Sequence, residues 1–237
     1  MMAWYSCART NEELVINLGK NGNIHSPAVY EAMKQTDRKH YIQNRPYEDS
    51  PQSIGYHATI SAPHMHAAAL EALHDHLTSN QNARSLDVGS GSGYLTVCLA
   101  RMMGVTGKSY GIEHIPELAN ASLENVQNDD ISLLETGRIT IKTGDGRLGY
   151  DPNHKQYELY DAIHVGAAAP TVPQALLDQL KRGGRLIIPV GNPGDTQTFQ
   201  QWDKQPDGSF KKNDLMDVVY IPLTDKKKQM KAFAFWS

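Results

Sequence analysis

Residues 85–95 read SLDVGSGSGYL, a pattern that predicts a strand, a tight turn and a helix in direct succession. Leu86 and Val88 indicate a short buried strand, and the alternate glycines indicate a turn at which a ligand can approach the main chain closely. We expect the helix to run from Tyr94 to about Met103. Its first turn would offer free N–H groups and a partial positive charge, so the stretch is suited to binding a carboxylate or a phosphate.

A carboxylate follows at the end of the next predicted strand, SYGIE, about 20 residues beyond Gly93. This residue, Glu113, can accept hydrogen bonds from both hydroxyls of a ribose. The dinucleotide fingerprint G-x-G-x-x-G/A is not met, because its sixth position falls on Tyr94 or Thr96. The spacing D-x-G-x-G-x-G, with Asp87 ahead of the glycines, instead resembles motif I of the class I S-adenosylmethionine methyltransferases. A tight turn without a ligand is the alternative, and the correctly spaced acid argues against it.

Composition excludes several classes of function. The chain has 237 residues, of which 40% are hydrophobic and 21% charged, and this suits one large α/β domain. A net charge of -3 does not indicate a basic surface that binds nucleic acid. No apolar run is long enough to cross a membrane, and the first residues lack the pattern of a signal peptide. The two cysteines, Cys7 and Cys98, provide neither a disulfide framework nor a metal knuckle. We therefore expect no metal site and a reducing, cytosolic location.

The N-terminal part of the chain is predicted to be helical, with an irregular segment after the first helices. Residues 10–36 indicate two short helices, the first capped by Thr10 and the second opened by Ser26. Residues 37–61 contain prolines, a glycine and three tyrosines without a clear period, so we predict an irregular, packed loop.

A further helix is expected to begin at Pro63 and to end near Leu77. Ser61 lies just before this helix, and its local sequence alone favours a helix cap. His64 and His66 are two residues apart, so they lie on different faces of the helix and are poorly placed to share a metal. Each histidine is by itself more typical of a structural hydrogen bond than of catalysis.

From Ser85 onward, predicted strands and helices alternate regularly. Further strands are expected at residues 138–143, 160–165 and 183–190, with helices at 116–127 and 173–180 between them. Such alternation predicts a doubly wound, mostly parallel, Rossmann-like α/β sheet with helices on both faces. Ligands of such sheets bind at the carboxyl ends of the strands, where Glu113, Asp145 and the small residues from Gly166 fall.

The end of the chain is predicted to add a closing antiparallel pair of strands, at residues 197–202 and 215–223. We expect a single domain over residues 1–237. Its parts are N-terminal helices with a substrate-binding segment (1–80), a cofactor-binding core (81–195), and C-terminal strands with a tail (196–237).

Longer segments resemble one family closely. These segments are TISAPHMHA (59–67), LDVGSGSGYL (86–95), GDGR (144–147), YDAIHVGAAAP (160–170) and PLTD (222–225). In order and over nearly the whole chain, they resemble protein-L-isoaspartate O-methyltransferase in its animal form. Members of this family transfer a methyl group from S-adenosylmethionine to the free α-carboxylate of L-isoaspartyl residues, and less readily to the side-chain carboxylate of D-aspartyl residues. The resulting ester collapses to a succinimide, so the resemblance implies a repair enzyme that releases S-adenosylhomocysteine.

The resemblance also implies the site residues. Ser61 matches the family's active-site serine. Residues expected to bind the cofactor are Ala58, Thr59, Ile60, Ser61, His66, Asp87, Gly89, Ser90, Gly91, Ser92, Glu113, His114, Asp145, Gly146 and Thr224. Glu113 stands where many relatives have an aspartate, and both residues provide the carboxylate that the ribose requires.

The implied chemistry needs no general base. An α-carboxyl group has a pKa of about 3.3–3.7, so the acceptor is already ionised at neutral pH. Catalysis should then depend mostly on orientation, which can supply about 7–11 kcal/mol. In this interpretation Ser61 positions the acceptor carboxylate by donating a hydrogen bond and is not a covalent nucleophile.

Two alternatives from other classes remain open at this point. One is a class I methyltransferase with a small-molecule acceptor, and the other is a non-catalytic adaptor that binds S-adenosylmethionine. The presence of Ser61, Glu113 and Asp145 argues against the adaptor. The expected partners are damaged proteins and peptides with L-isoaspartyl or D-aspartyl residues, bound by a monomer without nucleic acid or membrane.

Overall fold

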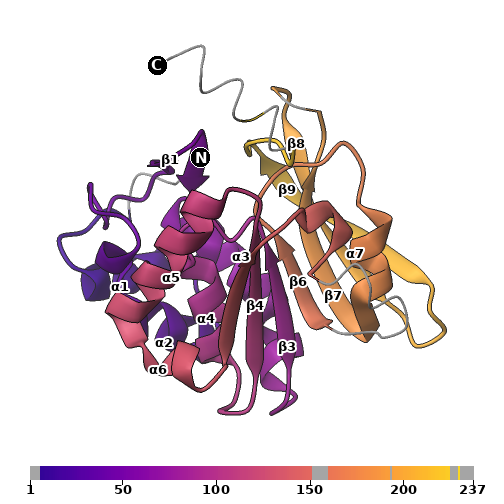
Figure 1. Cartoon of the computed structure of the whole chain (residues 1–237), viewed down its shortest axis with the longest axis horizontal. Coiled ribbons are helices and arrows are strands. Elements are labelled where there is room, and N and C mark those ends of the chain that lie inside the picture. The colour runs from indigo at the N-terminus through magenta and orange to yellow at the C-terminus, as the bar shows by residue number, and fades with distance from the viewer. Residues whose placement is uncertain (1–5, 151–159, 193, 225–228, 230–237) are drawn as a thin grey trace.

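The computed structural model describes residues 6–150, 160–192, 194–224 and 229. Seven strands form its main sheet, in the order β5-β4-β3-β6-β7-β8-β9 (Figure 1). Their bounds are β3 Arg84–Val88, β4 Lys108–Glu113, β5 Ile139–Thr143, β6 Tyr160–Val165, β7 Leu180–Val190, β8 Gln197–Lys204 and β9 Phe210–Val218. The strands from β5 to β7 are parallel to one another, while β8 and β9 pair antiparallel. The predicted doubly wound sheet with a closing antiparallel pair is thus confirmed.

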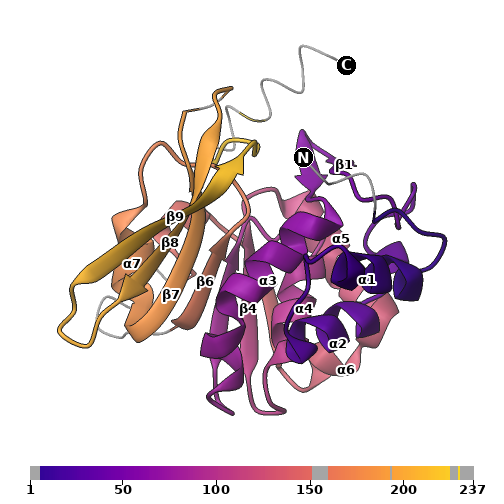
Figure 2. The ribbon, with the colours of Figure 1, turned by 180° about the vertical axis from the view of Figure 1, so that it is seen from behind.

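Helices cover both faces of this sheet. The helices are α1 Asn11–Lys20, α2 Pro27–Gln35, α3 Pro63–Thr78, α4 Tyr94–Met102, α5 Pro116–Asp130, α6 Ser132–Glu135 and α7 Gln174–Gln179. Helix α4 contacts both α3 and α5, whereas α7 packs on β7. The two views of the ribbon show α3 and α7 on opposite faces (Figures 1 and 2). Helix α3 packs on α4, which connects β3 to β4, whereas α7 connects β6 to β7. These two connections run in opposite directions along the sheet, so right-handed crossovers place α4 and α7 on opposite faces.

The first two helices form an outer layer over α3 and α4. Thr10 caps α1 as predicted, since its side chain accepts a hydrogen bond from the backbone of Glu13. The apolar faces of these helices join the largest core cluster, which contains Leu14 of α1, Leu73 of α3 and Cys98 of α4. Among the described residues, no helix has both the length and the apolar composition that crossing a bilayer requires.

Residues 37–61 are more regular than the sequence predicts. They contain a short 3-10 helix, η2 Arg38–His40, and an antiparallel hairpin of β1 Gln52–Gly55 and β2 Ala58–Ile60. The prediction of a wholly irregular loop is therefore wrong. The two residues at the hairpin turn, Tyr56 and His57, have positive φ angles of 51° and 54°. This conformation is rare for such residues, so the usual sequence signals of a hairpin are absent.

The closing strand β9 begins and ends earlier than predicted. It runs over Phe210–Val218, directly after the turn at residues 206–208, and not over residues 215–223. As the edge strand, it has most of its side chains exposed on both faces, so hydrophobic alternation does not mark its start. A further 3-10 helix, η3 Gly146–Leu148, follows β5 and lies against α7.

Candidate cofactor and acceptor site

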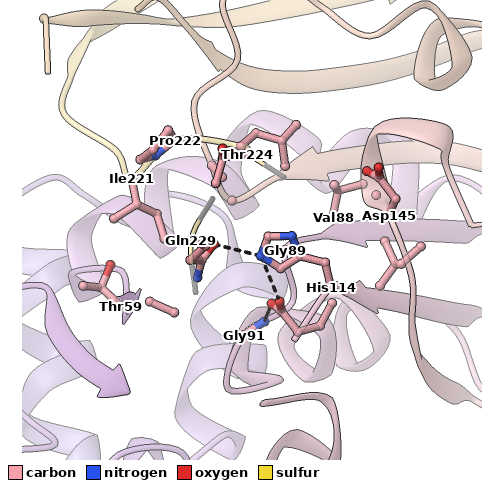
Figure 3. Close-up of a pocket in the computed structure, with 17 residues that line it drawn as sticks. Thr59, Val88, Gly89, Gly91, His114, Asp145, Ile221, Pro222, Thr224 and Gln229 are labelled. Atoms are coloured by element: carbon pink, nitrogen blue, oxygen red, sulfur yellow. Dashed lines mark hydrogen bonds and ion pairs between the residues drawn. The ribbon is translucent and has the colours of Figure 1, made fainter. Parts of the chain in front are cut away.

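A cavity opens at the carboxyl ends of the parallel strands (Figure 3). The residues that line it come from the β1–β2 hairpin, the glycine turn, the ends of β4, β5 and β6, and the segment after β9. They are Ala58, Thr59, Val88, Gly89, Gly91, Ile112, Glu113, His114, Asp145, Gly146, Gly166, Ala167, Ile221, Pro222, Leu223, Thr224 and Gln229.

The glycine turn requires its glycines. Gly89, Gly91 and Gly93 have φ angles of 75°, 51° and 86°, in the left-handed region that other residues rarely adopt. The turn also lies close to the end of β6, where a Cβ added to Gly166 would lie 3.1 Å from the carbonyl oxygen of Gly89. The bare backbone therefore forms one wall of the cavity, as the sequence predicts.

Glu113 joins the end of β4 to the glycine turn. One carboxylate oxygen accepts a hydrogen bond from the Gly91 N–H at 3.2 Å, and the other accepts one from the Ile115 N–H at 3.0 Å. The Nε2 atom of His114 lies 3.9 Å from this carboxylate and 2.8 Å from the amide oxygen of Gln229 (Figure 3). A carboxylate can accept about four hydrogen bonds, so Glu113 keeps capacity for two hydroxyl donors.

Asp145 lies at the end of β5 and faces the same cavity (Figure 3). The guanidinium of Arg147 binds both of its oxygens, with its Nη2 atom 2.6 Å from Oδ2. This hydrogen bond holds the pKa of the Asp145 carboxyl below its usual value. The side chain therefore remains an acceptor near neutral pH.

A smaller cavity adjoins the first and shares Thr59, Gly89, Gly91 and Gly166 with it. Its other lining residues are Ile60, Ser61, His66, Asp87, Ser90, Ser92, Leu95 and His164. Every residue predicted to bind the cofactor lines one of these two cavities. The structure thus brings the predicted residues together, while their individual roles stay predictions.

Two polar pairs lie at the smaller cavity. Asp87, at the centre of the sheet, is 2.8 Å from Nδ1 of His164 and accepts a hydrogen bond of 2.6 Å from the hydroxyl of Thr96. On the opposite side, His66 lies with its Nδ1 atom 3.1 Å from Nη1 of Arg38. Burial, followed by the positive charge of Arg38, lowers the pKa of His66 well below its ordinary value. His66 is therefore neutral at physiological pH.

Ser61 does not cap the helix that follows it. The N-cap of α3 is Ala62, and the His64 N–H in the first turn donates to the carboxylate of Asp49 at 3.0 Å. Ser61 instead lines the same open space as Tyr220, whose pKa burial raises to about 12. The helix-cap interpretation of Ser61 is wrong.

Ser61 lies where the smaller cavity meets an open groove. This groove is lined by Pro51, Thr59, Ser61, Ala62, His64, Met65, Asp217, Val218, Val219, Tyr220 and Ile221. Val219 in it is 81% exposed, so the groove offers apolar surface to solvent. His64, one of the two histidines considered from sequence, is held by Asp49 at 2.8 Å, which agrees with a structural hydrogen bond.

Several lining residues were not predicted. His164 lies within the YDAIHVGAAAP segment, so its place at the end of β6 was a usable signal. Gln229 had no such signal, because its contact with His114 spans 115 positions of the chain. Ile221, Pro222 and Leu223 are adjacent to the predicted Thr224, and the PLTD segment pointed to them only in part.

These features fit S-adenosylmethionine. The larger cavity has apolar walls from Val88, Ile112 and Ile221, which suit a purine, and a carboxylate at Glu113, which suits a ribose. The smaller cavity lies against the glycine turn and is lined by polar side chains, which suit a zwitterionic amino-acid end. No lining residue of either cavity contradicts this assignment.

Comparisons with known proteins agree with this geometry. A family model described as protein-L-isoaspartate(D-aspartate) O-methyltransferase matches residues 9–228. A protein-L-isoaspartate O-methyltransferase of Caenorhabditis elegans is 48% identical over 228 residues, covering 96% of this chain and 98% of the relative. Protein-L-isoaspartate O-methyltransferase 1 of Arabidopsis thaliana is 47% identical, with 95% and 96% covered.

A solved structure from Plasmodium falciparum, described as a protein-L-isoaspartate O-methyltransferase in complex with S-adenosyl-L-homocysteine, is also similar. It superimposes with a TM-score of 0.84 at 38% sequence identity, and the match covers 92% of this chain and 99% of that one.

Proposed function

The chain belongs to the protein-L-isoaspartate(D-aspartate) O-methyltransferase family, and from this premise we propose which of its residues perform the reaction. It is a methyltransferase that uses S-adenosylmethionine and acts on L-isoaspartyl and, less readily, D-aspartyl residues of damaged proteins. One observation carries the residue assignment: the smaller cavity, which adjoins the larger one, meets the groove at Ser61.

The larger cavity holds the adenosine part of the cofactor. Glu113 accepts the ribose hydroxyls, and Asp145 with Gly146 lies beside the adenine. The glycine turn and the polar side chains of the smaller cavity hold the amino-acid end. When bound, S-adenosylmethionine supplies a methyl group on a positively charged sulfonium, which is primed for in-line displacement.

The groove receives the acceptor peptide and leads its carboxylate to Ser61. The Ser61 hydroxyl donates a hydrogen bond to this carboxylate and fixes its direction of approach. No proton has to be removed, because the acceptor is already ionised at neutral pH. The chain's own contribution is alignment of the two reactants and partial exclusion of water.

The setting of the enzyme is also part of the proposal. The enzyme is a monomer in the cytosol without nucleic acid or membrane partners. The free thiols of Cys7 and Cys98 support the cytosolic location, and the net charge of -3 argues against a nucleic-acid partner.

Methyl transfer to a matched peptide pair tests this proposal. We expect label from S-adenosylmethionine to enter a synthetic isoaspartyl peptide and not its normal aspartyl twin, which has the same sequence and charge. Equal labelling of both peptides, or labelling of a small carboxylic acid alone, would contradict it. The second result would restore the small-molecule alternative.

A further inference from the structure

Arg38 is buried behind the site and has an unusual set of partners. It lies in η2, is 0% exposed, and makes no ion pair with a carboxylate among the described residues. Its Nε donates to the Pro46 carbonyl at 3.0 Å, and its Nη2 donates to the Ser61 carbonyl at 3.3 Å. Its Nη1 lies 3.1 Å from Nδ1 of His66. The negative charge of Asp49 also acts on Arg38, but it lies beyond ion-pair distance. Burying a guanidinium without an ion-pair contact costs free energy, so a hydrophobic side chain would serve better if Arg38 were needed for packing alone.

These contacts determine where His66 carries its proton. A guanidinium has donors only, so Nδ1 of His66 must be the acceptor. The pKa of His66 is held well below its ordinary value by burial and by Arg38, so the ring is neutral and its single proton is on Nε2. Within the described part of the chain, Nε2 has no hydrogen-bond partner, although the ring lines the smaller cavity. His66 therefore offers this cavity a hydrogen-bond donor.

The second histidine of the same cavity has the opposite arrangement. Nδ1 of His164 is 2.8 Å from the carboxylate of Asp87, which accepts, so the proton of His164 is on Nδ1. Nδ1 of His164 is thus a donor, whereas Nδ1 of His66 is an acceptor. The donor character of His66 is thus a consequence of its partner and not of histidine itself.

We infer that Arg38 is a positioning residue of the methyl-transfer site, which holds His66 as the Nε2–H tautomer so that a carboxylate in the smaller cavity always meets a donor. This inference rests on the proposed function. The carboxylate has two possible sources, the amino-acid end of the cofactor and the acceptor residue. In both cases Arg38 also binds the Ser61 carbonyl, so one guanidinium fixes both His66 and the segment that carries Ser61.

Loss of Arg38 should change how His66 titrates. The charged or titratable groups around this ring are Arg38 from η2, His64 on its own helix, Tyr94 of α4 at 4.9 Å between ring centres, and His164 of β6 with Asp87 of β3. Without the positive charge of Arg38, the pKa of His66 rises and either nitrogen can carry the proton. At acid pH the imidazolium would still donate from Nε2, so the defect should shrink as the pH falls.

NMR of the His66 ring nitrogens, recorded for the full wild-type chain and for its Arg38→Met variant, tests the inference. In the wild type we expect the Nε2–H tautomer throughout pH 6 to 8. In Arg38→Met we expect a mixture of tautomers that titrates, and about a 10-fold weaker interaction with a carboxylate near pH 8. Arg38→Lys keeps the positive charge but lacks the planar set of donors of a guanidinium, so its interaction with the carboxylate should be weakened less than in Arg38→Met.

Two binding measurements identify the source of the carboxylate. If affinity for S-adenosylhomocysteine falls while affinity for 5′-methylthioadenosine, which has no carboxylate, is kept, the cofactor is the source. If cofactor affinity is kept and KM for an isoaspartyl peptide rises, the acceptor is the source. Both results support the inference.

The control is Arg101→Met, which removes another mostly buried arginine that lines neither cavity and pairs with Asp129. It should lower stability and leave the His66 ring unchanged. A folded Arg38→Met protein with an unaltered His66 tautomer, or with unaltered affinities and KM, would overturn the inference. If Arg38→Met does not fold, the same ring measurement on Arg38→Lys decides. A wild type inactive on isoaspartyl peptides would refute the proposed function but not the tautomer assignment.

Discussion

At the scale of single residues, Glu113 has the best-defined part in the account. Hydrogen bonds to a charged group contribute roughly 1.5–3 kcal/mol, so Glu113→Ala should weaken S-adenosylhomocysteine binding by about 10- to 100-fold. Calorimetry measures this, with Glu117→Ala as the control, because Glu117 is exposed at the start of α5. Glu113 also binds the Gly91 N–H, so Glu113→Gln, which keeps the shape, separates loss of charge from loosening of the turn. Unchanged affinity in a folded Glu113→Ala protein would remove Glu113 from the site.

Ser61 should affect the acceptor and not the cofactor. We expect Ser61→Ala to lower kcat/KM for an isoaspartyl peptide by about 10-fold and to leave cofactor affinity nearly intact. Because Ala62 and not Ser61 is the N-cap of α3, the melting temperature should change little. Ser53→Ala, at an exposed serine of β1, is the control. A variant that is less stable but fully active would show that Ser61 has only a structural role.

The absence of a general base gives a pH prediction. The rate of methyl transfer in single turnovers, at saturating cofactor and peptide, should be nearly flat from about pH 6 to 8. The acceptor is ionised over this window, and His66 is neutral over it because burial lowers its pKa. The rate should fall only at acid pH, as the acceptor takes up a proton. A limb near pH 6.5 that disappears in His66→Gln or His64→Gln would show that a histidine takes part in proton transfer.

At the scale of helices and strands, the sequence predicts buried elements better than exposed ones. The strand β3 and the glycine turn could be predicted because buried residues and obligatory glycines leave a clear pattern. The β1–β2 hairpin could not, because Tyr56 and His57 adopt positive φ without the Asn or Gly that marks such a turn. The start of β9 was missed because an exposed edge strand needs no alternation.

The site was predictable to the extent that its residues lie in local motifs at strand ends. The motifs around Ser61, Gly89, Glu113 and Asp145 supplied most of the lining of both cavities. Arg38 and Gln229 carry no such signal, because each reaches the site through contacts between distant parts of the chain. Sequence patterns show only which residues are close along the chain. They cannot show these two contacts, because each depends on how separate elements pack against one another.

The junction between α2 and α3 gives a prediction about stability. One oxygen of Glu71 on α3 accepts hydrogen bonds of 2.8 Å from the backbone N–H groups of His25 and Ser26, and the other accepts the Ser26 hydroxyl at 2.7 Å. Burial raises the pKa of Glu71, but the hydrogen bonds from Ser26 outweigh this and hold it below its usual value. Glu71→Gln should therefore destabilise the fold by about 1–2 kcal/mol near neutral pH without changing kcat/KM.

The pH dependence of this effect has a definite sign. Because the folded pKa lies below the unfolded value of about 4.3, the stabilisation is complete above that value and is lost as the pH falls through the folded pKa. Denaturant unfolding of the wild type and Glu71→Gln at pH 7 and pH 3 measures it, with exposed Glu117→Gln as the control. A stability difference that grows toward acid pH would contradict this account of the junction.

At the scale of the whole molecule, the core predicts a single cooperative unit. One apolar cluster contains Leu14 from the N-terminal segment, Leu99 from the cofactor-binding core, and Phe199 with Val218 from the C-terminal strands. Calorimetric unfolding should therefore show one transition, which S-adenosylhomocysteine shifts upward. Two separate transitions, with only one of them moved by the ligand, would show that the segments are independent domains.

Repair of an isoaspartyl peptide, followed by mass spectrometry and chromatography over time, tests the central claim most directly. With catalytic amounts of the protein and excess S-adenosylmethionine, the isoaspartyl peptide should pass through a methyl ester and a succinimide. The normal aspartyl peptide should then accumulate, while an aspartyl peptide supplied at the start remains unchanged. A methyl ester on the aspartyl twin, or an isoaspartyl peptide that remains unmodified although the protein binds S-adenosylhomocysteine, would contradict the account.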